Sequence, residues 1–157
     1  MLIRVEIGID APGIDALLRR TFGRDAEAQL VHDLREDGLI TLGVVATDDE
    51  GQVIGYVAFS PVAVEGEELQ WVGLAPLAVD EHYRGQGIGR QLVYEGLDSL
   101  NEFGYAAVVT LGDPDLYRRF GFERPRASIS AAAGRTARRR SRFTVWRMTL
   151  SKASTAR

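Results

Sequence analysis

The most informative segment of the sequence is Leu77-Ala78-Val79-Asp80-Glu81-His82-Tyr83-Arg84-Gly85-Gln86-Gly87-Ile88-Gly89. Its apolar beginning predicts the end of a β-strand, and apolar residues recur at a helical period from about Gly87 to Phe103. Where glycines replace side chains, consecutive backbone N–H groups can point into one concavity, and the helix that begins there adds the positive end of its dipole. The segment therefore predicts a loop that binds an anion such as a pyrophosphate.

Three known classes of glycine-rich loop have sequence patterns that can be compared with this segment. A Walker loop requires Gly-Lys followed by Ser or Thr, and the segment has no such sequence. A dinucleotide loop of the form Gly-x-Gly-x-x-Gly would require glycine at position 90, where the chain has Arg90. The third pattern, Arg/Gln-x-x-Gly-x-Gly/Ala, is matched by Arg84, Gly87 and Gly89. Taken alone, the loop is also compatible with an ordinary tight turn into a helix.

Hydrophobic periodicity predicts alternating strands and helices on both sides of this segment. Asp10 is a candidate N-cap for the first helix. The order indicates an α/β or α+β sheet covered by helices, in one domain of residues 1–157. The predicted elements are a strand at Leu2–Ile7, a helix after Asp10, a helix around Ala28–Leu34, a hairpin of Leu42–Ala46 and Val53–Phe59, a strand at Leu69–Val79, a helix at about Gly87–Phe103, a strand at Ala106–Leu111, a short helix at Asp115–Phe120 and a strand at Phe143–Leu150.

The composition is that of a globular protein. Of 157 residues 45% are hydrophobic and 26% are charged, which is close to the average for soluble domains. The chain has no cysteine, so disulfides, thiolate metal sites and a cysteine nucleophile are excluded. It begins without the pattern of a secretory signal, and no apolar run approaches the roughly 20 residues of a membrane span. We therefore expect a cytoplasmic protein.

A second motif follows the predicted strand Ala106–Leu111. The run Tyr117-Arg118-Arg119-Phe120-Gly121-Phe122, together with the glycine loop, resembles the GNAT superfamily of N-acetyltransferases. The resemblance covers nearly the whole chain, because the order of the predicted elements is that family's order. The strings Leu74–Val79 and Leu111–Pro114 are similar to a bacterial subgroup labelled YhbS-like, whose acceptors are undefined.

The resemblance implies a mixed, mostly antiparallel central sheet flanked by helices, with splayed fourth and fifth strands. Pro76 fits such an opening because proline cannot donate to a sheet ladder. The implied reaction is transfer of an acetyl group from acetyl-CoA to a primary amine by direct attack, with no metal. The resemblance assigns cofactor binding to Leu77, Ala78, Val79, Arg84, Gly85, Gln86, Gly87, Ile88 and Gly89.

In the same resemblance, Tyr117 occupies the position of the general acid. A phenol with a pKa near 10 is protonated at neutral pH and can donate to a leaving thiolate. The alternative is a core tyrosine with a satisfied hydroxyl. The identity of the general base stays open. Glu65, Glu67 and Glu68 are candidates, but a surface turn rich in acidic residues is usually only solvated. His32 and His82 make no metal pair, His82 is expected to be exposed, and Trp71 and Trp146 are expected to be packing residues.

Basic residues are concentrated at the end of the chain. From Arg118 onward there are 12 Lys or Arg residues and one acidic residue, although the net charge of the whole chain is -3. The Arg-rich loop at about 131–142 suggests a rival function as a polyanion-binding adaptor, but it has no interleaved aromatic residue and is explained more simply as a solvated loop. A short flexible tail is expected from about 151. A non-catalytic acyl-CoA sensor is the other alternative.

The expected partner is therefore a small-molecule or peptide amine rather than nucleic acid or a membrane. Many GNAT proteins are dimers, so a homodimer also stays open.

Overall fold

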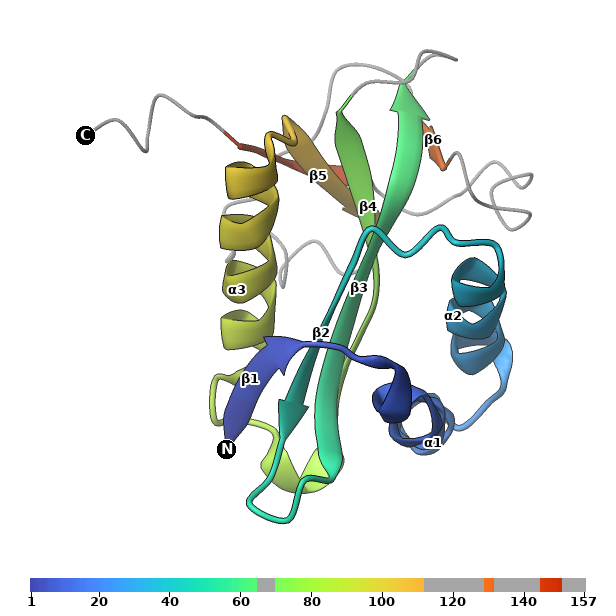
Figure 1. Cartoon of the computed structure of the whole chain (residues 1–157), viewed down its shortest axis with the longest axis vertical. Helices are drawn as coiled ribbons and strands as arrows, with labels where there is room; N and C mark the ends of the chain where they lie inside the picture. Colours follow the sequence, from blue (N-terminus) through green and yellow to red (C-terminus); the bar gives the residue numbers. More distant parts are fainter. Residues whose placement is uncertain (65–69, 112–128, 132–144, 151–157) are drawn as a thin grey trace. The chain divides into compact units, whose positions relative to one another are not determined.

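The structure, a computed structural model, describes residues 1–64, 70–111, 129–131 and 145–150. Its elements alternate between strands and helices in the predicted manner (Figure 1). In chain order they are β1 (Leu2–Val5), the 3₁₀ turn η1 (Gly8–Asp10), α1 (Ala11–Phe22), α2 (Ala26–Glu36), β2 (Leu42–Thr47), β3 (Val53–Val64), β4 (Trp71–Val79), the 3₁₀ turn η2 (Glu81–Tyr83), α3 (Ile88–Phe103), β5 (Ala107–Leu111), β6 (Ile129–Ala131) and β7 (Val145–Thr149).

Two compact units divide the chain. The first consists of residues 1–59 and 76–96, and the second of residues 60–75 and 97–157. The boundary between the units runs through β3, β4 and α3, so one part of each element belongs to the first unit and the other part to the second. The expectation of one domain over residues 1–157 stays a prediction. Among the described residues, no helix is both long enough and apolar enough to span a membrane.

The sheet of the first unit has the strand order β1-β2-β3-β4. β1 pairs with β2, and β2 with β3, both antiparallel. The second pairing is irregular: Ala46 lies opposite Gly55, but Thr47 lies opposite Val53, so Ile54 is an extra residue on β3. Such a bulge bends the strand and reorients its backbone groups.

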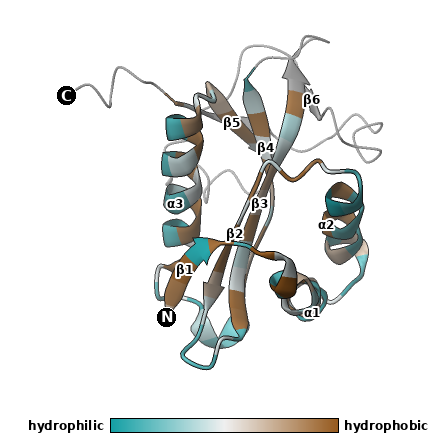
Figure 2. Cartoon of the chain, viewed as in Figure 1, coloured by the Kyte–Doolittle hydropathy of each residue, from teal (hydrophilic) through white to brown (hydrophobic). Residues whose placement is uncertain are grey.

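Helices cover both faces of this first sheet. α1 and α2 lie side by side over one face, and the first half of α3 lies over the other (Figure 1). In Figure 2 the sides of α2 and α3 that face the strands are largely hydrophobic and their outer sides hydrophilic, as amphipathic helices require. The core beneath α1 and α2 is formed by Ile14, Leu17, Leu18, Ala28, Val31, Val45, Val53, Tyr56, Ala58 and Ala78.

Just after β1, side-chain hydrogen bonds to Glu6 connect β3 and α2 with the start of the chain. The hydroxyl of fully buried Tyr56 donates to Glu6 Oε1 at 2.6 Å, and Arg35 Nη2 donates to Glu6 Oε2 at 2.7 Å. Burial, and next the Glu6 carboxylate, raise the pKa of Tyr56, so this phenol stays protonated. Gly43 is required beside it, because a Cβ there would collide with the Glu6 side chain.

In the second unit, the first part of β4 pairs with β5 in parallel and β5 pairs with β7 antiparallel. The described pairing of β4 with β5 ends at Leu74 and Thr110, where Thr110 Oγ1 donates to the Leu74 carbonyl at 3.0 Å. In this register the partner of Pro76 would be residue 112, outside the described residues, so the predicted splaying of the fourth and fifth strands stays a prediction. The mixed, mostly antiparallel sheet with flanking helices confirms the predicted fold class.

Four details differ from the sequence-based expectations. β3 continues to Val64, five residues beyond the predicted end at Phe59. β1 ends at Val5 rather than Ile7, because the chain turns into η1. The Asp10 side chain does not cap α1; it accepts hydrogen bonds from Arg4 and from the Ile7 N–H. β6, which pairs with the end of β3, was not predicted, because three residues are too short for a periodicity. The predicted helix at 115–120 lies outside the described residues.

Gly96 allows α3 to lie close to β3, because a Cβ at this position would overlap the ring of fully buried Phe59. Gly96→Ala is therefore expected to lower the free energy of unfolding by about 1–3 kcal/mol, the usual cost of overpacking. This loss outweighs the gain of up to about 1 kcal/mol in helix propensity. Urea unfolding measures the difference. Gly89→Ala is the matched control in the same helix, since its Cβ would meet only Val79 Cγ2 at an ordinary 3.6 Å. Equal stability of Gly96→Ala and the unsubstituted chain would contradict the close packing.

Candidate functional site

The predicted binding segment leads from the end of β4 through η2 and the glycine loop into α3. β4 ends at Val79 and α3 begins at Ile88, so the expected strand–loop–helix arrangement is confirmed. All nine residues to which the sequence assigned cofactor binding are described and belong to the first unit. Their role in binding stays a prediction.

Gly85 and Gly87 both adopt the left-handed backbone conformation, each with φ of 79°. This conformation is costly for any residue with a Cβ and free of strain for glycine. A Cβ at either position would have no atom within 4 Å, so space is open beside both residues. Glycine is thus required by the backbone, and a ligand can approach that backbone closely.

The amino end of α3 follows this open loop directly. The first helical hydrogen bond runs from the Gln91 N–H to the Gly87 carbonyl at 3.0 Å. The amides before Gln91 have no partner within the helix, as at every helix N-terminus, and they carry the positive end of the helix dipole. An anion beside Gly87 would meet both features at once.

The side chains of this segment differ in what they contact. Ala78 and Ile88 are buried, and Ala78 belongs to the core beneath α1 and α2. Leu77 and Val79 are half-buried, and the Val79 side chain lies near Gly89. Ala78 and Ile88 can therefore contribute to a ligand site mainly through their backbone. Arg84 and Gln86 are exposed, and Arg84 Nε donates to the Val79 carbonyl at 3.2 Å.

Asp80 begins the loop and was not among the predicted site residues. Its Oδ1 accepts a hydrogen bond from the His82 N–H at 2.9 Å, which caps η2. The hydrogen bond from His82, and next that from Arg20, hold the pKa of Asp80 below its usual range, although partial burial acts in the opposite direction. An aspartate before a turn is a capping signal in the sequence, but Arg20 lies 60 residues earlier and no local pattern connects the two.

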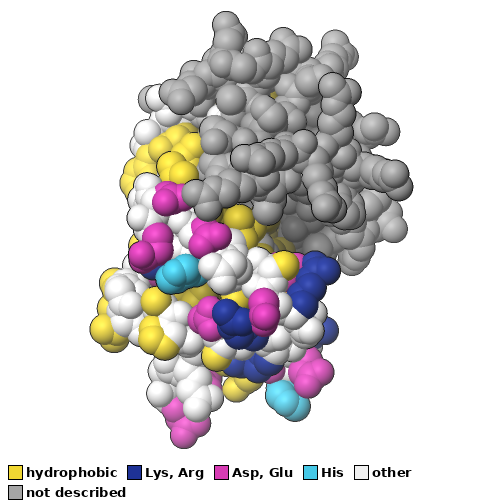
Figure 3. Space-filling view, turned by 90° about the vertical axis from the view of Figure 1, so that its right-hand side faces the viewer, with side chains coloured by type: hydrophobic (Ala, Val, Ile, Leu, Met, Phe, Trp, Pro, Cys, Tyr) yellow, Lys and Arg dark blue, Asp and Glu magenta, His cyan; other side chains and the backbone are white. Residues whose placement is uncertain are grey.

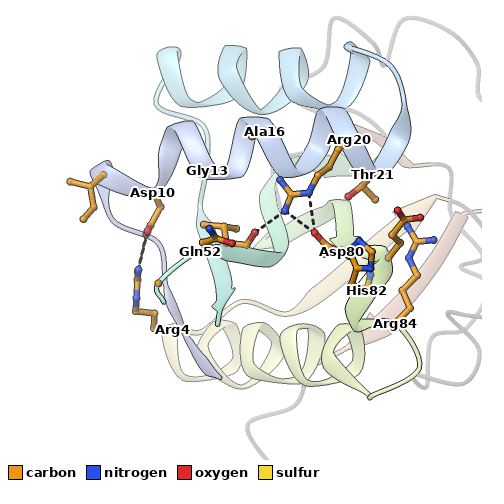
Figure 4. A pocket seen from close by; sticks show the side chains of 14 residues that line it. Arg4, Asp10, Gly13, Ala16, Arg20, Thr21, Gln52, Asp80, His82 and Arg84 are labelled. Carbon is orange, nitrogen blue, oxygen red and sulfur yellow. Dashed lines mark hydrogen bonds and ion pairs between the residues drawn. The ribbon is translucent and has the colours of Figure 1, made fainter. Parts of the chain in front are cut away.

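A cavity of about 840 Å³ lies in the first unit between α1, the β2–β3 turn and η2 (Figure 4). Two ion pairs lie along it, Arg4 with Asp10 and Arg20 with Asp80. Asp10 is 6% exposed, and the hydrogen bond from Arg4 lowers its pKa against the effect of burial. The cavity is lined by Arg4, Ile9, Asp10, Gly13, Ala16, Arg20, Thr21, Gly51, Gln52, Val53, Asp80, Glu81, His82 and Arg84.

Charges of both signs are interspersed on the outer face of α1 and α2, as far as the described surface shows (Figure 3). In the cavity Asp10 and Asp80 each form an ion pair with an arginine, so the charges of these two acids are compensated. Neither this face nor the cavity presents a basic side-chain patch, so the glycine loop stays the predicted anion-binding feature.

Comparison with known proteins identifies the family. The model of the acetyltransferase (GNAT) domain matches residues 41–124, which is more than half of the chain and includes β4, the glycine loop and α3. The chain belongs to the GNAT family. The GNAT resemblance of its two motifs and of its element order is thus confirmed.

The relatives agree with the predicted bacterial subgroup. The chain is 86% identical over 123 residues to YhbS of Escherichia coli strain K12, an uncharacterized N-acetyltransferase, covering 78% of this chain and 74% of that protein. A crystal structure of E. coli YhbS in complex with CoA is similar with a TM-score of 0.83 and 69% identity, over 96% of this chain and 81% of that one. A GNAT acetyltransferase from Brucella melitensis in complex with acetyl-CoA has a TM-score of 0.75 and 36% identity, over 92% and 94% of the two chains.

Several predicted residues of the GNAT site lie outside the described parts of the chain. They include Tyr117 and the candidate base residues Glu65, Glu67 and Glu68; the arginines of the basic loop, on which the rival polyanion-binding function rests, also lie outside the described residues. His82 is exposed as predicted, and His32 is exposed as well. Within the described ranges, no three His, Asp or Glu residues form a group that could hold a metal ion.

Proposed function

We propose that this GNAT chain transfers the acetyl group of acetyl-CoA to a primary amine. The observation that carries the proposal is the open glycine loop, in which Gly85 and Gly87 are left-handed and adjoin the amino end of α3. The complexes of E. coli YhbS with CoA and of the Brucella enzyme with acetyl-CoA support the choice of ligand.

Cofactor binding is assigned to the backbone more than to side chains. The amides from Gly85 to Gly89 would hold the pyrophosphate, because they adjoin open space and the positive end of the helix dipole. The backbone of Leu77, Ala78 and Val79 would pair with the pantetheine arm beyond the point where the described β4–β5 pairing ends. Arg84 and Gln86 are exposed and adjoin the same loop.

The reaction is direct attack on the thioester. The neutral amine nitrogen forms a bond to the carbonyl carbon, the C–S bond breaks, and the attacking nitrogen loses a proton to solvent or a base. A backbone N–H at or near Val79 would stabilise the developing oxyanion. Tyr117 would protonate the CoA thiolate, a role that rests on the Tyr-x-x-x-Gly-Phe motif.

The acceptor is a small-molecule or peptide amine in this proposal, and the reaction is cytoplasmic, because acetyl-CoA is available there. Neither a membrane nor nucleic acid takes part. A homodimer is not needed for the chemistry, since every assigned residue belongs to one chain.

Binding and turnover are tested separately. Acetyl-CoA at 100 times its Kd should raise the free energy of unfolding by about 2.7 kcal/mol, which melting curves detect. S-acetylpantetheine lacks the pyrophosphate and is the matched control, so it should give a much smaller shift. Coincident curves at millimolar acetyl-CoA would contradict the proposal.

A panel of amines with acetyl-CoA, read by release of free CoA thiol, then tests catalysis. We expect thiol release that depends on at least one amine. Binding of acetyl-CoA without thiol release for the whole panel would favour the acyl-CoA sensor.

A further inference from the structure

Arg20 of α1 connects two strands at the start of the glycine loop. Its Nε donates to Asp80 Oδ2 at 3.0 Å, and its Nη2 lies 2.9 Å from the same oxygen and donates to the Val53 carbonyl at 3.1 Å. Figure 4 shows the guanidinium of Arg20 pointing toward Asp80, with dashed lines for its interactions. A planar guanidinium can bridge acceptors in this way, whereas the ammonium group of lysine offers a single point charge.

Asp80 in turn uses its backbone and its side chain to hold the segment that leads into the loop. Its N–H donates to the Ile54 carbonyl at 2.8 Å, and its carbonyl accepts from the Tyr83 N–H at 2.9 Å. Its carboxylate accepts from both Arg20 and the His82 N–H. The Asp80 side chain is 12% exposed and that of Arg20 is 48% exposed, so the pair is shielded from water on the Asp80 side and open to it on the Arg20 side.

The two carbonyls that receive these bonds belong to the bulge of β3. Ile54 is the extra residue there, and Val53 precedes it. Because a bulge takes backbone groups out of the regular ladder, adjacent carbonyls become available to partners outside the sheet. The Val53 carbonyl binds Arg20, and the Ile54 carbonyl binds the Asp80 N–H. α1, β3 and the end of β4 are thereby joined at one point.

We propose that Arg20 and Asp80 form a positioning pair that preorganises the glycine loop for CoA. They anchor the loop at Asp80, while buried Ile88 anchors its other end, so that only the residues around Gly85 to Gly87 must be ordered by the ligand. Glycine has the greatest backbone freedom of any residue, so fixing both ends of a short glycine loop reduces the entropy lost on binding. The inference rests on the proposed function, because the pair matters for activity only if the loop binds CoA.

An effect of charge alone and a positioning effect predict opposite changes in the CoA affinity of Asp80→Asn. Asp80→Asn removes a negative charge near the loop and leaves Arg20 without its counter-ion. Simple electrostatics therefore predicts tighter binding of the anionic CoA. Positioning predicts weaker binding, because the amide of asparagine can still cap η2 but no longer forms the ion pair with Arg20.

The experiment measures CoA affinity by titration calorimetry on the full chain, for Arg20→Gln, Asp80→Asn and the double variant. Each single variant should weaken binding roughly 10-fold, as expected when a hydrogen bond to a charged group is lost. The double variant should bind CoA no more weakly than the weaker-binding single variant, because each single substitution already removes the Arg20–Asp80 interaction. Hydrogen exchange of the amides from His82 to Gly87 should become faster in all three.

Arg19→Gln is the matched control. Arg19 is the neighbouring residue of α1 and also forms ion pairs, with Asp15 at 2.8 Å and Asp25 at 2.6 Å, away from the loop. Its CoA affinity should stay within about twofold of the unsubstituted chain, as expected for exposed ion pairs. Arg20→Lys keeps the charge and serves if Arg20→Gln does not fold; it should also bind CoA more weakly.

Each outcome is distinguishable. Unchanged affinity in Arg20→Gln or Arg20→Lys, tighter binding in Asp80→Asn, or additive losses in the double variant would overturn the positioning pair while leaving the proposed function intact. Absence of CoA binding by the unsubstituted chain would instead overturn the proposed function, and the positioning pair with it.

Discussion

Tyr117→Phe is expected to lower kcat with the best amine by roughly 10²- to 10⁴-fold, the usual contribution of a positioned general acid. The substitution keeps the aromatic ring and removes only the hydroxyl, so the dissociation constant for acetyl-CoA should change little. Some activity should remain, because the leaving thiolate can also take its proton from water. Steady-state kinetics combined with calorimetry separates the two effects.

Tyr105→Phe is the control for this experiment, since it removes a phenol hydroxyl from the turn before β5. Its kcat should stay close to that of the unsubstituted chain. A large drop in melting temperature for Tyr117→Phe would indicate a buried structural hydrogen bond instead of a catalytic one. Unchanged turnover, under conditions in which chemistry limits the rate, would exclude Tyr117 as the acid.

Gly87→Glu should weaken acetyl-CoA binding by roughly 10²- to 10³-fold. Two like charges about 4 Å apart repel by about 4 kcal/mol at an effective dielectric constant of 20, and every 1.4 kcal/mol corresponds to a tenfold change in affinity. The open space beside Gly87 leaves the new carboxylate where the phosphate would lie. Calorimetry with acetyl-CoA measures the change.

Backbone strain contributes to this variant and has to be measured separately. Gly87 has φ of 79°, so any L side chain there costs roughly 1–2 kcal/mol of stability. Gly87→Ala introduces the same strain without the charge, so the difference between alanine and glutamate isolates the repulsion. If both variants bound acetyl-CoA as tightly as the unsubstituted chain, the assignment of the loop would be wrong.

Local patterns in the sequence predicted the structural features that depend on residues close together in the chain. The glycines between a strand and a helical period predicted a tight loop that leads into the helix, and the structure has this loop with Gly85 and Gly87 in the left-handed conformation. The apolar period predicted α3 to within one residue of its start. These short-range features also include the motifs that carry the family, so the GNAT fold is recognisable in the amino-acid sequence itself.

Which side chains and strands contact each other depends on the tertiary structure. Asp10 was expected to cap α1, but its carboxylate binds Arg4 instead, because β1 brings a guanidinium within 2.9 Å. β6 has no periodicity of its own and exists through its pairing with β3.

The Arg20–Asp80 contact joins residues 60 positions apart. It depends on the bulge of β3 and on the packing of α1, neither of which has a signal near Asp80 in the sequence. Such contacts form only when strands and helices far apart in the chain are brought together by burial of the core, so their geometry is a property of the folded chain and not of any local pattern.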